Sequence, residues 1–185
     1  RAERYGDFDQ MEFTPELASA LDIYAEEITT HTNYSKLLVV DCLNLEIKEI
    51  LNTLFYQVLN IENNLYSWAR TMSKYGDFFL YLDIDEDIGI KNVVGLPAGE
   101  VERMEGLDES NPSYIQFQWN SAGMTLENWQ CAHFRVLGND KYAPYGTSIL
   151  DPARRIWRQL TMLEDAMMAY RIVRSPDRRI FYIDV

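Results

Sequence analysis

The chain has 185 residues, and its 47% hydrophobic and 13% aromatic content is enough for the core of one domain, or of one domain with an extension. No apolar run is long enough to span a membrane, and residues 1–13 lack the hydrophobic segment of a signal peptide. The net charge of −12 is concentrated in residues 1–150, which carry ten basic and twenty-four acidic residues, and such an acidic body argues against tight general binding to DNA.

The first elements are a helix and a short strand. Residues 1–13 mix polar and aromatic side chains without a clear period. Thr14 and Pro15 open a helix that runs to about Thr29, because apolar residues recur on one of its faces. A polar connection then leads to residues 36–41, KLLVVD, which predict a short buried strand.

Two helices and a buried strand follow. Asn44 can cap a helix whose apolar residues keep helical spacing to Leu59, and residues 60–64 interrupt that pattern. The next helix runs to Tyr75, and Gly76 stands where a helix C-terminus favours a left-handed residue. Residues 78–83, FFLYLD, are apolar on both faces and predict a strand that is covered on both sides.

The second half predicts further strands and a loop. Residues 101–105 suggest a short strand. Residues 113–119 alternate, with Ile115, Phe117 and Trp119 on one face, and residues 131–137 alternate with Ala132, Phe134 and Val136 predicted to point inward. Residues 138–150 form a loop rich in glycine and proline.

A long helix is the most distinct element. Asp151 can cap it and Pro152 fits its first position, and the helix reaches Arg174, because the residue before Pro176 leaves the helical region. Apolar residues lie on more than one side, so the helix needs more than one packing partner. It is either a central core helix or a helix packed between copies of the chain. Residues 180–185 predict a terminal strand.

Long and specific sequence runs cover most of the chain. They are DFDQMEFTPELASALDIYAEEIT, IKEILNTLFYQVLNIENNLYSWARTMSKYGDFFLYLDI, NPSYIQFQW, HFRVLG, KYAPYGTSILDPARRIWRQLTMLEDAMMAYRIVR and SPDRRIFYIDV. These runs resemble the portal proteins, or head–tail connectors, of tailed bacteriophages with contractile tails. Members of that family are much longer than 185 residues, so the resemblance implies a fragment.

The resemblance implies an α+β fold in which helices pack on a small mixed or antiparallel sheet. Residues 1–150 would be a wing-like domain, residues 151–175 a stem-like helix and residues 176–185 the start of a clip-like region. It also implies a homo-oligomeric ring of twelve copies at the portal vertex of the virion, assembled in the host cytoplasm, through which double-stranded DNA is packaged and ejected. The implied partners are the large terminase, neck and tail connector proteins, capsid and scaffold proteins and, transiently and without specificity, DNA. The family implies no enzymatic activity and no cofactor.

The arginines of the long helix are the candidate functional residues. Arg154, Arg155 and Arg158 lie in its first turns, where the helix dipole disfavours cations, so we expect acidic partners from this chain or from an adjacent subunit. The oligomer-interface candidates are Arg154, Arg155, Trp157, Arg158, Met162, Met168 and Tyr170. Arg171 and Arg174 are candidates for the DNA channel or, as the favoured alternative, for contact between subunits, although they also suit helix-end electrostatics alone. Arg178 and Arg179 join them at that end.

The acidic residues, histidines and cysteines give weaker evidence for a functional site. Asp83, Asp85 and Asp87 resemble a calcium loop, but Ile88 and Val94 occupy the positions where an EF-hand needs Gly and Glu. Glu164 and Asp165 are adjacent on a helix and diverge by about 100°. His31 and His133 are expected to be structural, and Cys42 and Cys131 leave two free thiols or one disulfide open. The rival functions are a metal-dependent hydrolase, which needs at least two of these five acids to converge in a pocket, and a monomeric acidic adaptor.

Overall fold

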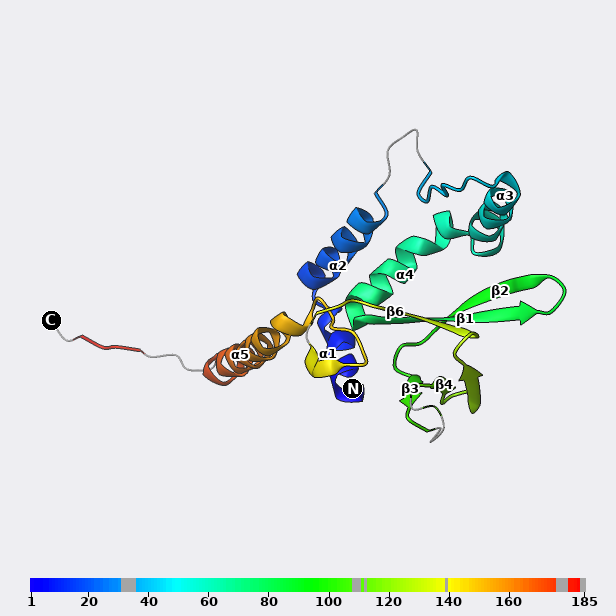
Figure 1. Cartoon of the computed structure of the whole chain (residues 1–185). Coiled ribbons are helices and arrows are strands. Elements are labelled where there is room, and N and C mark those ends of the chain that lie inside the picture. The colour runs from blue at the N-terminus through cyan, green and yellow to red at the C-terminus, as the bar shows by residue number, and fades with distance from the viewer. Residues whose placement is uncertain (31–35, 108–110, 112, 139, 176–179, 184–185) are drawn as a thin grey trace. The chain divides into compact units, whose positions relative to one another are not determined.

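The structure is a computed structural model that describes residues 1–30, 36–107, 111, 113–138, 140–175 and 180–183. The chain divides into two compact units, Arg1–Asp151 and Pro152–Val185 (Figure 1). The first unit combines helices with two antiparallel sheets, and the second contains one long helix, so the predicted α+β class is confirmed. Within the described ranges, no helix has the length and apolar character needed to cross a membrane.

Capping residues explain two of the helix boundaries in the first unit. They are α1 (Ala2–Met11), α2 (Pro15–Ile28), α3 (Leu45–Thr53) and α4 (Ile61–Tyr75), and a π-helical turn, η1 (Leu54–Val58), continues α3. The side-chain oxygen of Asn44 accepts a hydrogen bond from the Glu46 N–H at 2.9 Å, as expected of a cap. Gly76 ends α4 with φ +83°, which confirms the predicted left-handed C-terminus.

In the first 41 residues the sequence misses one helix and wrongly predicts one strand. Helix α1 lies in the stretch that shows no clear period, where Tyr5, Phe8 and Met11 form its buried side. Residues 36–41 are not a strand. The Tyr56 hydroxyl accepts from the Leu38 N–H at 3.2 Å and donates to the Leu38 carbonyl at 2.6 Å, so a side chain of η1 satisfies this backbone instead of a neighbouring strand.

The strands form two three-stranded antiparallel sheets. One has the order β2-β1-β6 and contains β1 (Asp77–Asp85), β2 (Gly89–Leu96) and β6 (Cys131–Arg135). The other has the order β3-β4-β5 and contains β3 (Val101–Glu105), β4 (Ile115–Trp119) and β5 (Met124–Glu127). The strands at β1, β3, β4 and β6 are predicted from sequence, whereas β2 and β5 are not.

The inward face of β6 is the opposite of the predicted one. Phe134 is 48% exposed, whereas the side chains of Cys131 and His133 are buried. His133 lies opposite Phe79 of β1, and the two rings stack with their centroids 4.4 Å apart. Phe79 also meets Phe117 of β4 edge-on at 6.0 Å, which joins the two sheets.

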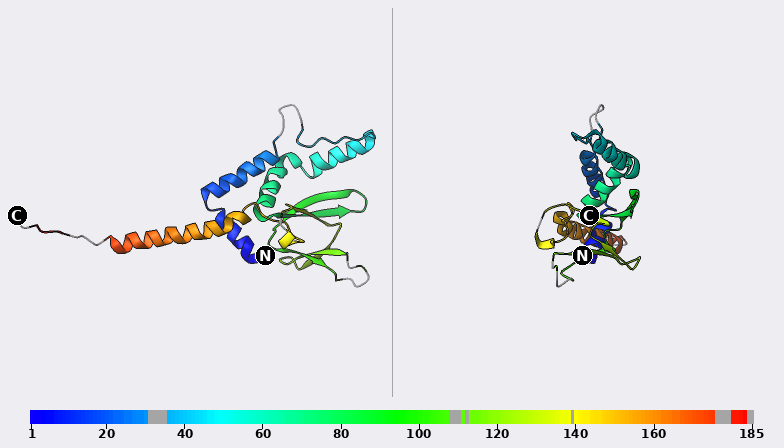
Figure 2. Two further views of the ribbon diagram at one scale, coloured as in Figure 1. Left: turned by 60° about the vertical axis from the view of Figure 1, so that its left-hand side comes forward. Right: turned by 45° about the vertical axis from the view of Figure 1, so that its right-hand side comes forward.

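Helix α4 links the helices to the first sheet. It lies beside α2 (Figure 2), and Trp68 stacks on Phe78 of β1 with the ring centroids 5.8 Å apart. Arg70 pairs with Glu12 and, at 2.6 Å, with Asp22. Lys74 pairs with Asp9 of α1 at 2.6 Å and with Glu12 at 2.6 Å, so ion pairs join α1, α2 and α4. Burial alone lowers the pKa of Lys74, but its acidic partners hold that pKa above its ordinary value.

The long helix starts later than predicted. A 3₁₀ turn, η3 (Asp151–Ala153), precedes α5 (Arg154–Arg174), and the carboxylate of Asp151 accepts from the Tyr142 hydroxyl at 3.1 Å and does not cap the helix. The end at Arg174 is as predicted. Residues 180–183 are not in a strand, so the predicted terminal strand is wrong over these residues, and residues 184–185 lie outside the described part of the chain.

Candidate functional site

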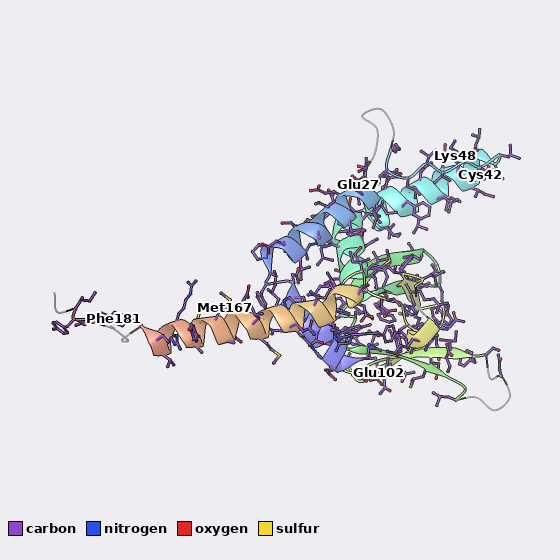
Figure 3. The ribbon with its side chains drawn as sticks, turned by 90° about the vertical axis from the view of Figure 1, so that its left-hand side faces the viewer. Glu27, Cys42, Lys48, Glu102, Met167 and Phe181 are labelled. Carbon is purple, nitrogen blue, oxygen red and sulfur yellow. The ribbon has the colours of Figure 1, made fainter. Side chains whose placement is uncertain are left out.

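Helix α5 exposes apolar side chains on more than one side. Met162 is 73% exposed and Met168 is 66% exposed, and α5 contains no buried residue. Side chains project outward along the helix in Figure 3, where Met167 is labelled. The exposed apolar residues are Ile156, Leu160, Met162, Leu163, Met167, Met168, Tyr170, Ile172 and Val173. An isolated helix of this composition leaves a large apolar area in water, which favours association with a further surface.

The candidate arginines lie at the two ends of α5. Arg154 is half-buried like Trp157, whereas Arg155 and Arg158 are exposed. Arg171 and Arg174 lie in the last turn, where the helix dipole favours cations. The guanidinium of Arg174 lies 4.8 Å from the ring centroid of Tyr170, so the structure brings together one interface candidate and one channel candidate. Arg178 and Arg179 lie outside the described residues, as does His31.

The three aspartates that resemble a calcium loop lie at the end of β1 and in the turn that joins it to β2. The carboxylate of Asp85 accepts from the N–H of Asp87 at 3.0 Å and of Ile88 at 3.4 Å, and Asp83 lies opposite Asn92 of β2. Over the described ranges, no group of three or more His, Cys, Asp or Glu side chains is placed to hold a metal ion. This local hydrogen bonding accounts for the carboxylate of Asp85 without a ligand.

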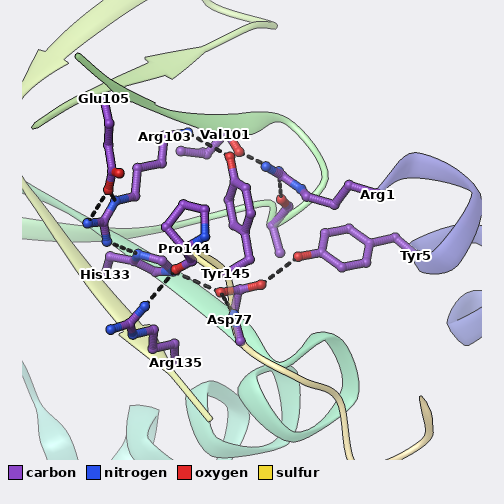
Figure 4. Close-up of polar contacts among 12 residues, drawn as sticks. Arg1, Tyr5, Asp77, Val101, Arg103, Glu105, His133, Arg135, Pro144 and Tyr145 are labelled. Atoms are coloured by element: carbon purple, nitrogen blue, oxygen red, sulfur yellow. Dashed lines mark hydrogen bonds and ion pairs between the residues drawn. The ribbon is translucent and has the colours of Figure 1, made fainter. Parts of the chain in front are cut away.

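The first unit also contains a buried polar centre that sequence analysis misses. Asp77, at the start of β1, has a fully buried side chain, and its carboxylate accepts three hydrogen bonds (Figure 4). The donors are the hydroxyl of Tyr5 at 2.7 Å, Nε2 of His133 at 2.8 Å and the N–H of Gly146 at 2.8 Å. Burial alone would raise the pKa of Asp77, but these three donors hold it below its ordinary value.

His133 is a structural histidine, as expected. Its Nε2 contacts Asp77, and its Nδ1 lies 3.4 Å from Nη1 of Arg103. Because a guanidinium only donates, Nδ1 is the accepting nitrogen of the ring and Nε2 is the nitrogen that donates to Asp77. The side chain is only 5% exposed, so the ring is not placed to bind a metal or to reach a substrate.

A segment that we call the strap, residues 142–150, is bonded to α4 and β3 of the first unit. The hydroxyl of Ser148 donates to the carbonyl of Lys74 at 2.5 Å, and the Ile149 N–H donates to the carbonyl of Ser73 at 3.2 Å. The Arg103 N–H donates to the Tyr145 hydroxyl at 2.9 Å. The chain is therefore fixed to the end of α4 and to β3 a few residues before α5 begins.

The two cysteines do not form a disulfide. Both thiols are free, Cys42 is half-buried and Cys131 is buried on β6. Burial raises the pKa of Cys131 to about 12, so this thiol stays protonated and unreactive at neutral pH.

Comparisons with known proteins agree on one family. Residues 1–185 match the family model described as Bacteriophage T4-like portal protein (Gp20). The chain is similar to the portal protein of Salmonella phage ViI, at 24% identity over 220 aligned residues that cover 97% of this chain and 39% of that protein. It is also similar to the portal protein of Vibrio phage KVP40, at 52% identity over 54 residues that cover 29% of this chain and 11% of that protein. The chain thus spans less than half the length of these relatives.

Proposed function

Because this chain belongs to the T4-like portal protein family of bacteriophages, as its sequence motifs predict, we propose that it forms part of a ring of identical subunits at one capsid vertex. Twelve copies surround a channel through which double-stranded DNA enters during packaging and leaves at infection. The ring is assembled in the host cytoplasm and remains in the virion as the head–tail connector. Its role is structural, and it needs no cofactor.

The observation that carries this proposal is the exposure of α5. A head-to-tail ring gives every subunit two different neighbours, and a helix that is apolar on more than one side can bury one side against each of them. Each methionine or leucine that is fully covered contributes roughly 1.5 to 3 kcal/mol. With nine large apolar side chains exposed on α5, the association of several copies has a sufficient driving force.

The proposal also assigns functional regions, which rest on membership of the portal protein family. Residues 1–150 act as the wing-like domain, residues 151–175 as the stem-like helix, and residues 176–185 begin the clip-like region that docks the large terminase and later the neck and tail connector proteins. The capsid and scaffold proteins contact the outside of the ring. The strap belongs to the wing-like domain, because it is bonded to that domain up to Ile149.

The two groups of arginines have different roles in the proposal. Arg154, Arg155 and Arg158 pair with acidic residues, including those of an adjacent copy, and together with Trp157, Met162, Met168 and Tyr170 they form the subunit interface. Arg171 and Arg174 contact DNA phosphates transiently as the duplex passes. The acidic charge of the rest of the chain keeps these contacts weak, so that DNA is not held in place.

Electron microscopy of the full-length protein tests the proposal. We expect rings with a central hole wide enough for duplex DNA. Single compact particles over the whole concentration range would contradict the portal role and favour the monomeric adaptor.

A further inference from the structure

A second apolar surface lies at one end of the first unit. Ile47 and Ile50 are exposed on one face of α3, Leu43 and Leu45 are exposed at its start, and we call these four residues the α3 surface. Helix α3 has no buried residue, whereas η1, its continuation, lies against β2. One side of this helical segment is therefore attached to the first unit, and the α3 surface has no covering element among the described residues of that unit.

The surroundings of the α3 surface are strongly acidic. Residues 41–50 and the hairpin residues 83–91 carry seven acids and two lysines, a net charge of −5. The contact between η1 and β2 brings the two segments to the same end of the unit (Figure 1). At the hairpin, Ile88 is also exposed, so apolar and acidic side chains are interspersed there. Such a surface selects a partner that is both apolar and basic.

Helix α5 has the complementary character. It carries five arginines and two acids, a net charge of +3, together with its exposed apolar residues. In a ring of identical copies, unlike surfaces of two copies meet at every interface. We propose that the α3 surface binds α5 of a second copy of this chain. This inference rests on the proposed function and deepens it by naming the surface of the wing-like domain that receives the helix.

Apolar side chains and charged side chains have different roles in this contact. Contact between the apolar side chains supplies the free energy, because it removes their surface from water. The opposite charges determine which surface is chosen and in which direction the helix lies, and they speed the encounter of two copies at low salt. A helix that is apolar on more than one side can contact the α3 surface and still use another side against a neighbouring α5.

Site-specific photo-crosslinking tests this inference. The photoreactive amino acid p-benzoylphenylalanine replaces Ile50 in the full-length protein, and light and ¹⁵N-labelled copies are mixed before assembly. After irradiation, mass spectrometry should find adducts to residues 154–174, and about half of them should join a light copy to a heavy one. The matched control places the same amino acid at Leu107, a similarly exposed position just after β3, and should give no adduct to α5.

The charges are tested in the same assay. Replacing both Glu46 and Glu49 by lysine should lower the adduct yield several-fold at low salt, because both lie on α3 beside the apolar residues and are exposed. Glu102→Lys, an exposed acid on β3, should leave the yield unchanged. Raising the salt concentration from about 0.05 to about 0.5 M should reduce the wild-type yield, since exposed charges are screened over a few ångströms at that concentration.

The outcomes separate this inference from the proposed function. The α3–α5 contact is overturned if the rings are intact but the photoreactive residue at position 50 gives no adduct, or adducts only to other segments or to α5 of its own copy. The portal role would still stand in that case. If the protein forms no rings, both are overturned. Adducts between copies that map to α5 support both.

Discussion

At the scale of single residues, Asp77 determines how three distant segments meet. Its donors Tyr5 and Gly146 are 72 and 69 residues away in the chain. Asp77→Asn keeps the shape of the side chain but removes the charge and makes one of the two polar atoms a donor that faces donors. We expect the free energy of unfolding of the first unit to fall by about 3 kcal/mol. Urea denaturation measures this, and Asp83→Asn on the exposed hairpin is the control, with an expected change within about 0.5 kcal/mol.

The same residue predicts an acid sensitivity. Because the pKa of Asp77 in the folded protein lies below its ordinary value, its contribution to stability is fully present above about pH 4 and is lost as pH falls through the folded value. Burial and the nearby Asp77 raise the pKa of Tyr5, so its contribution is present below about pH 10 and is lost as pH rises further. The urea midpoint of the wild type should therefore fall more steeply at acid pH than that of Asp77→Asn. Parallel profiles would show that Asp77 is not the responsible group.

Two glycines form a matched pair for testing the strap. Gly76 and Gly89 have almost the same φ, +83° and +84°. A Cβ at Gly76 would lie 2.6 Å from the backbone N of Ser148, whereas a Cβ at Gly89 would meet nothing within 4 Å. Gly89→Ala should cost about 1 to 2 kcal/mol of unfolding free energy, from its left-handed backbone alone, and Gly76→Ala about 3 to 4 kcal/mol because it also displaces the strap. Equal losses in thermal or urea unfolding would mean that the strap is not packed on α4.

At the scale of elements, α5 should matter for assembly and not for the folding of one copy. Met168→Glu places a charge on an exposed position, so the helix itself is hardly affected. If that position is covered by another copy, the buried carboxylate has no partner and assembly is strongly weakened. Mass photometry should show subunits instead of rings for Met168→Glu. Gln159→Glu adds the same charge at another exposed position outside the apolar set and should still assemble.

Local sequence signals predict the elements whose boundaries depend on local chemistry. Asn44, Gly76 and the period of α5 identify helix ends and a helix from a few neighbouring residues. The buried residues Tyr5, Phe8 and Met11 of α1 do recur at helical spacing, but three positions in a short helix that contains Gly6 give a weak signal. Residues 36–41 have the composition of a strand, but a strand needs a neighbour that pairs with its backbone, and Tyr56 satisfies Leu38 instead.

The sequence predicts only the part of the candidate site that depends on local residue spacing. The apolar and basic residues of α5 are visible in sequence because they repeat at helical spacing. Asp77, His133 and the strap are not visible, because their contacts join positions far apart in the chain. Alternation shows that β6 has two faces, but it cannot show that His133, paired with a buried carboxylate, decides which face is inside.

At the scale of the whole molecule, charge and apolar surface are divided between the two units. The first unit is acidic and its described part has a packed core, whereas α5 is basic and exposes most of its apolar side chains. This division is expected of a protein in which the acidic unit of one copy binds the basic, apolar helix of another copy. It also agrees with the finding that α5 has no buried residue in a single copy.

Oxidation of methionines by hydrogen peroxide tests the central claim, that other copies cover α5. Met162, Met167 and Met168 lie on α5, Met124 on β5 is 46% exposed and serves as the reactive reference, and the fully buried Met11 is the protected one. In the assembled full-length protein, we expect the three methionines of α5 to be oxidised at least about tenfold more slowly than Met124, because contact between copies excludes the oxidant. Oxidation of all three at the rate of Met124 in intact assemblies would contradict the account.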